Sequence, residues 1–132
     1  MPASYLINRN LGVVFSHAWG VLTDTDLLEH QRRLGDDQRF EPSLNQIFSF
    51  EDVTEVEVTP AGIQILAERT LFGAGSRRAL VVHPGAMKLF GLMRMFEILT
   101  SKHPDRLRVQ FDHVKQALEW IGVPDSGGAA GD

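Results

Sequence analysis

The chain has 132 residues, of which 43% are hydrophobic and 23% are charged, and its formal net charge is -4. This length and balance indicate one globular domain and exclude an intrinsically disordered chain. The acidic balance argues against nucleic-acid binding, which normally requires a basic surface. Because the chain has no cysteine, disulfides, thiol nucleophiles and thiolate-ligated metals are excluded.

The composition changes near the carboxyl end. We expect the domain to cover residues 1–123 and residues 124–132, which are small or polar, to form a loose tail. No secretory signal is visible, and no apolar run reaches the roughly 20 residues that a membrane span needs. A cytoplasmic protein that is not transmembrane is therefore expected.

The first third of the chain predicts a hairpin followed by a helix. Residues 4–8 and 12–22 are rich in β-branched and aromatic residues, and the short segment between them suits two antiparallel strands. Thr23 then offers an N-cap hydroxyl, and two aspartates suit the first turn of a helix that ends at Gly35.

Strands and helices then alternate to the end of the domain. The remaining predicted strands cover residues 45–53, 77–83 and 106–112, and the remaining helices run from Thr59 to Gly73, from Pro84 to Leu99 and from His113 to Gly122. The order ββαβαβαβα predicts a single α/β domain with four helices. Its sheet is expected to be mixed but mostly parallel, with about five strands and an antiparallel hairpin at one edge.

This element order and the passage FEDVTEVEVTPAGIQIL, from strand into helix, resemble the STAS domains of anti-sigma-factor antagonists over residues 4–123. They also resemble the bacterial SpoIIAA-like group described as STAS/SEC14-like. In the antagonist family the junction is similar to Asp-Ser-Ser-Gly, and phosphorylation of a serine at the helix start switches off partner binding. Aligning Gly62 with the family glycine places Ala61 at that serine, so the resemblance implies no phosphorylation there.

The junction Thr59-Pro60-Ala61-Gly62 is nevertheless a candidate partner-binding site. A helix N-terminus favours negative charge through its unpaired N–H groups and its dipole. Thr59 could therefore be phosphorylated or could face a carboxylate of a partner. The structural alternative is that Thr59 is only an N-cap and that Pro60 presets the first helical turn.

A second group of candidates follows the predicted strands. Carboxyl ends of parallel strands meet at one edge of a sheet, where open α/β folds bind ligands. Carboxylate and imidazole groups are also ligands of zinc and iron. The candidates for a metal site or for acid–base catalysis are Glu51, Asp52, His83, Asp112 and His113. The alternative is that Asp112 caps the last helix and that the acidic residues are simply solvated.

The third predicted helix is apolar on more than one face, which is unusual for a surface helix. One face must pack on the sheet, and a second would need cover from another subunit, another protein or a lipophilic ligand. Core packing is the alternative, because methionine often fills irregular gaps in a core. The candidate interface or pocket residues are Leu89, Phe90, Met93, Met95 and Phe96.

These observations favour a non-enzymatic interaction or regulatory binding module of STAS-like type that needs no cofactor. A protein partner or self-association is the first expectation, without nucleic acid. One alternative is a carrier or sensor of a small lipophilic molecule, and another is a small metal-assisted hydrolase.

Overall fold

The structure is a computed structural model that describes residues 2–73, 75–102, 106–111 and 113–122. The predicted order ββαβαβαβα is confirmed. The elements are β1 (Ala3–Asn8), β2 (Val13–Thr23), α1 (Asp24–Asp36), β3 (Asn45–Glu57), α2 (Pro60–Glu68), β4 (Arg77–Val81), α3 (Met87–Leu99), a short 3-10 helix (Thr100–Lys102), β5 (Arg106–Phe111) and α4 (Val114–Ile121). The predicted tail, residues 124–132, lies outside the described residues.

All five strands form one sheet in the order β1-β2-β3-β4-β5. β1 pairs antiparallel with β2, with Leu6 opposite Phe15, and every later pair is parallel. The predicted mixed sheet with an antiparallel edge hairpin is therefore confirmed. The β2–β3 register shifts twice, and Gly20 lies at the second shift with a φ of 67°, a conformation that glycine adopts without strain.

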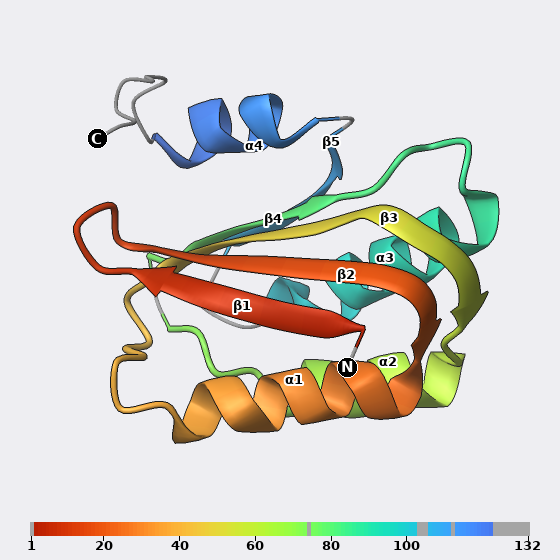
Figure 1. The fold of residues 1–132 in the computed structure, drawn as a ribbon, viewed down its shortest axis with the longest axis horizontal. Helices are drawn as coiled ribbons and strands as arrows, with labels where there is room; N and C mark the ends of the chain where they lie inside the picture. Colours follow the sequence, from red (N-terminus) through yellow and green to blue (C-terminus); the bar gives the residue numbers. More distant parts are fainter. Residues whose placement is uncertain (1, 74, 103–105, 112, 123–132) are drawn as a thin grey trace.

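The helices are divided unequally between the two faces of the sheet. Figure 1 shows α1, α2 and α3 on one face and α4 on the other. The larger core lies under α1, α2 and α3 and includes Leu22, Ile63 and Leu80. A smaller core lies under α4, where Ala117 and Ile121 contact Val13, Ile47, Ala79 and Val81. α4 thus covers only part of the face of the sheet on which it packs.

Three predicted boundaries were wrong by three or more residues. β3 continues to Glu57 instead of stopping at residue 53, because it keeps pairing with β2 past the register shifts. α2 stops at Glu68 instead of Gly73, since the following segment leaves the helix and buries Phe72 in a core with Leu34. α3 begins at Met87 instead of Pro84, because residues 83–86 form a hydrogen-bonded turn.

Among the helices that the structure describes, none combines the length and the apolarity needed to cross a membrane.

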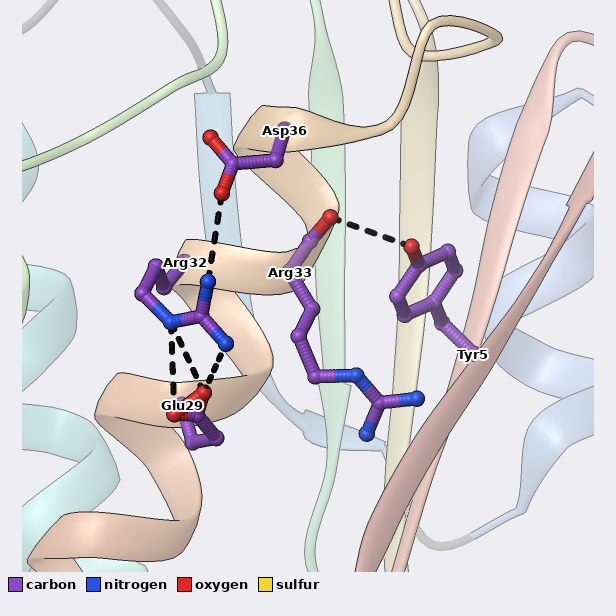
Figure 2. Close-up of polar contacts among 5 residues, drawn as sticks. All are labelled: Tyr5, Glu29, Arg32, Arg33 and Asp36. Atoms are coloured by element: carbon purple, nitrogen blue, oxygen red, sulfur yellow. Dashed lines mark hydrogen bonds and ion pairs between the residues drawn. The ribbon is translucent and has the colours of Figure 1, made fainter.

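Tyr5 connects the edge strand β1 to the carboxyl end of α1. Its hydroxyl lies 3.2 Å from the carbonyl oxygen of Arg33, as Figure 2 shows, and 2.8 Å from a carboxylate oxygen of Asp37. Burial, and then the hydrogen bond to Asp37, raise the pKa of Tyr5. On the exposed side of the same helix Arg32 pairs with Glu29 and Asp36 (Figure 2), exposed pairs that contribute little to stability.

We expect Tyr5→Phe to lower the free energy of unfolding by about 1 kcal/mol, because it removes one hydrogen bond and keeps the ring. Urea unfolding followed by circular dichroism measures this loss. An unchanged midpoint would show that the tie between β1 and α1 adds nothing to stability.

Candidate functional site

The junction before α2 binds within its own chain. The Thr59 hydroxyl oxygen accepts a hydrogen bond from the backbone N–H of Gly62 at 3.1 Å, so its predicted role as N-cap is confirmed. The Thr59 hydroxyl and backbone N–H also donate to the two carboxylate oxygens of Asp24, at 2.5 and 2.8 Å. The carboxylate of Asp24, the first residue of α1, therefore occupies the position at which this helix N-terminus would attract an anion.

Gly62 is required by this close approach. A Cβ atom built on Gly62 would lie between 2.2 and 2.7 Å from the carboxylate atoms of Asp24, closer than nonbonded atoms can come. Pro60 and Ala61 are exposed beside it. The junction thus holds the starts of α1 and α2 together, and its role in binding a partner stays a prediction.

The metal candidates Glu51 and Asp52 lie within β3, not after it, because this strand is longer than predicted. They belong to two separate pairs. Asp52 lies 2.7 Å from Nε2 of His17, and Glu51 lies 3.8 Å from Nδ1 of His113. Within the described ranges, no three acidic, histidine or cysteine residues come close enough to share a metal ion.

His83 lies at a groove of about 310 Å³ between the end of β3 and the start of α3. Glu51 lines the same groove, so the structure brings these two candidates to one groove. Nδ1 of His83 accepts a hydrogen bond from the backbone N–H of Gly85 at 2.9 Å. Asp112 lies outside the described residues, and the cap of α4 that was expected from it is His113.

The residues proposed as an interface on α3 lie mostly in the core. Leu89, Met93 and Phe96 are at least 95% buried, and Phe90 and Met95 are half-buried against the same cluster. Leu89, Met93 and Phe96 are therefore not available to a second subunit, whereas a contact through Phe90 and Met95 stays a prediction. Two of the five, Met93 and Phe96, line an internal cavity.

This cavity of about 50 Å³ lies between the sheet and the layer of α1, α2 and α3. Most of its wall is apolar and aromatic, but it also contains three buried polar side chains, His30, Gln46 and Arg78. The full lining consists of Leu27, His30, Gln31, Leu34, Gln46, Phe48, Phe50, Ile63, Leu66, Leu71, Phe72, Arg78, Leu80, Met93 and Phe96.

The polar side chains form a continuous row that runs from α1 across β2 and β3 to β4. Nε2 of His30 lies 2.9 Å from the Ser16 hydroxyl, which also accepts a hydrogen bond from Nε2 of Gln46 at 3.2 Å. Oε1 of Gln46 accepts a hydrogen bond from Nε of Arg78 at 3.1 Å. The guanidinium of Arg78 lies 4.4 Å from the centre of the Phe72 ring, a cation–π arrangement.

His30 is neutral in this environment at physiological pH. Burial is the largest cause, and the positive charges of Arg33 and Arg78 add to it, so that the pKa of His30 falls from 6.5 to about 4. The row therefore contains one positive charge, on Arg78, beside a neutral imidazole ring.

A second unassigned feature is the side of β1 and β2 that α4 leaves uncovered. Leu6, Trp19 and Val21 are exposed there, and we call these three residues the open face. Successive side chains of a strand point to opposite faces of the sheet, so buried neighbours such as Ile7 and Ala18 point to the other face. The His17 ring lies beside Trp19, with their centroids 5.4 Å apart.

Sequence reasoning missed both features, although signals for them exist. His30 lies between Leu27 and Leu34 on the buried stripe of α1, where a polar residue marks a polar contact inside the core. Arg78 and Gln46 interrupt two strands that are otherwise apolar toward the helices. The partners of these residues come from distant parts of the chain, so the sequence alone did not connect them.

The close contact between Gly62 and Asp24, here called the interlock, predicts that the effect of Gly62→Ala on the free energy of unfolding depends on residue 24. We expect Gly62→Ala to destabilise the native chain, because the new methyl group collides with Asp24. In an Asp24→Ala background the collision is absent, and the same substitution should be neutral or stabilising by up to about 1 kcal/mol through helix propensity. Chemical unfolding of the four proteins measures both effects. An equal cost in the two backgrounds would contradict the interlock.

His30 predicts a dependence of stability on pH. The unfolded chain binds a proton at His30 below about pH 6.5, whereas the folded chain binds it only near pH 4. Stability is therefore unaffected above pH 6.5 and falls between pH 6.5 and 4, by about 3 kcal/mol in total. Urea unfolding measured across this range gives the free energy of unfolding against pH. We expect its dependence on pH to weaken in His30→Gln and to persist in His83→Gln, the same change at an exposed site. Equal slopes would exclude His30 as its source.

A solved structure with this architecture supports the assignment of the fold. The crystal structure of an uncharacterized protein of the DUF3478 family from Shewanella loihica PV-4, with a SpoIIAA-like fold, is similar to this chain with a TM-score of 0.58 at 15% sequence identity. The match covers 90% of this chain and 93% of that chain. No protein-family model matches the chain, and no curated protein is significantly similar to it. At this identity the likeness shows the fold alone. The chain therefore has a SpoIIAA-like fold, which agrees with the STAS-like resemblance of its sequence.

Proposed function

We propose that this chain is a non-enzymatic interaction module of STAS-like type that associates with a second copy of itself through β1 and the open face. The observation that carries the proposal is the exposure of Leu6, at 62%, on an edge strand without any charged residue. Leu6 belongs both to the edge and to the open face, so a contact at the edge also covers this residue of the open face.

The edge of β1 is suited to pairing. Natural sheets usually protect their edge strands with lysine, proline, a bulge or a covering segment, because unpaired backbone groups attract other strands. β1 reads Ala-Ser-Tyr-Leu-Ile-Asn and contains none of these residues, and its register with β2 is regular. Its outer edge pairs with no other strand of the described residues.

A second copy supplies a matching surface. Two β1 strands that pair antiparallel about a two-fold axis would continue the sheet from one subunit to the other. The same operation brings Leu6 of each copy to the seam, whereas Trp19 and Val21 lie further along β2, beyond Ala18, which pairs with Ala3. Both copies carry the net charge of -4, but β1 itself carries none. Repulsion across the seam is therefore small.

The cavity weighs against a carrier of large lipophilic molecules. Pockets for drug-sized ligands measure roughly 300–1,000 Å³, whereas the cavity under α1, α2 and α3 measures about 50 Å³. The hydrolase alternative has no support from the paired carboxylates of β3, which contact two different histidines.

We expect Leu6→Lys to shift the chain toward the monomer, because it places a charge at the seam of both copies. Ile98→Lys is the matched control, since Ile98 is 63% exposed and lies on α3, away from β1. Sedimentation equilibrium of the native chain and both variants measures the association constant. A monomeric native chain at all concentrations, or equal weakening by both variants, would contradict the proposal. Pairing with a different protein through the same edge would also contradict self-association.

A further inference from the structure

The polar row in the cavity has more hydrogen-bond donors than acceptors. The Ser16 oxygen already accepts a hydrogen bond from Gln46 and lies 2.9 Å from Nε2 of His30. If the Ser16 hydroxyl donates to Nε2, the single ring proton of neutral His30 is on Nδ1, which has no acceptor among the residues described. If Nε2 donates instead, the hydroxyl hydrogen of Ser16 has no acceptor among them. Either arrangement leaves one donor unmatched.

Gln46 contributes a second unmatched donor. Its Oε1 accepts the hydrogen bond from Arg78, which fixes the orientation of the amide group. One N–H of the amide then donates to Ser16, and the other has no acceptor within the described part of the chain. Gln46 is only 2% exposed and lines the cavity, so bulk water does not reach this donor freely. Buried donors without acceptors are costly, so each of them calls for a partner such as a water molecule, an ion or a bound ligand.

The charge and shape of the cavity restrict that group. Arg78 brings a positive charge to the same row, and Gln46 and the His30–Ser16 pair each bring a donor without an acceptor among the described residues. The rest of the wall is apolar, with Leu66, Met93 and Phe96 among its side chains. A ligand that fits both parts has an anionic acceptor at one end and a short hydrocarbon part at the other.

We propose that this cavity is a binding site for a short-chain monocarboxylate such as acetate or propionate. Its carboxylate accepts hydrogen bonds from Gln46 and from the His30–Ser16 pair, and its methyl end contacts the apolar wall. The size agrees, because about 50 Å³ accommodates only a few water-sized groups. The cavity and the open face lie on opposite sides of the sheet, so either can function without the other.

The entrance lies between α1 and α2. All residues of the lining are buried except Gln31 and Leu71, which are half-buried. Nε2 of Gln31 on α1 donates to the carbonyl oxygen of Leu66 on α2 at 3.3 Å. A ligand would enter by displacing the side chains of Gln31 and Leu71, without opening the sheet.

The first test uses the native chain and ¹³C-labelled propionate. We expect saturable shifts of the Met93 and Leu66 methyl resonances, nuclear Overhauser contacts from those methyl groups to propionate, and a higher Tm than in sodium chloride at equal ionic strength. Propionate that shifts only surface resonances would overturn the proposal, as would a cavity whose methyl resonances do not respond.

The second test changes the donor. Gln46→Glu keeps the shape and the acceptor for Arg78 but replaces the N–H donors with a carboxylate, so we expect propionate to bind about tenfold more weakly or worse. Gln64→Glu makes the same change at an exposed position of α2 and should bind as the native chain does. Equal affinity in the two variants would overturn the proposal. If Gln46→Glu does not fold, the experiment on the native chain still decides.

Discussion

The burial of Arg78 is the constraint on which the interior of this domain depends. Because Arg78 is only 6% exposed, its guanidinium must exchange its hydration for contacts inside the chain. Gln46 accepts from it, Ser16 accepts from Gln46, and His30 contacts Ser16, so one charged side chain determines the polar groups of two further strands and of α1. Because the row crosses β2, β3 and β4, a shift of register in either pair would break it.

The unequal division of the helices explains what remains on the outside. Three helices bury one face of the sheet, and only α4 packs on the other, over β3, β4 and β5. The hairpin strands β1 and β2 therefore keep one side that α4 covers only near Val13 and Phe15. The same hairpin is the edge of the sheet, so its exposed apolar residues and its unpaired backbone groups occur together.

The fold could be predicted from sequence because its signals are local. Alternation in β1 and β2, the N-caps Thr23 and Thr59, and the apolar stripe of α1 each act within a few residues. The boundaries of α2 and α3 could not be predicted, because the segments beside them are held by contacts with distant residues. Gly73, for example, donates its backbone N–H to the carbonyl oxygen of Pro42.

The candidate sites were harder to predict than the fold, because they depend on contacts between residues that are distant in the sequence. Counting apolar residues on α3 suggested a surplus face, but that count cannot show that α2 and the sheet surround this helix closely enough to bury Leu89, Met93 and Phe96. Spacing likewise placed Thr59 at a helix start and could not show that Asp24, 35 residues earlier in the chain, would bind it. Both contacts join residues that are distant in the sequence, and packing decides which of these residues meet.

The strand order has a consequence for how the chain folds. Each strand pairs with the strand that precedes it in sequence, and no later strand inserts between two earlier ones. During synthesis, which proceeds from the amino end, β2 can pair with β1, and each new strand can then join the growing edge as it emerges. The sheet can therefore assemble in the order of translation. Within the described residues, the outer edges of the first strand, β1, and the last strand, β5, pair with no other strand, whereas β2, β3 and β4 are each covered by the strand that follows.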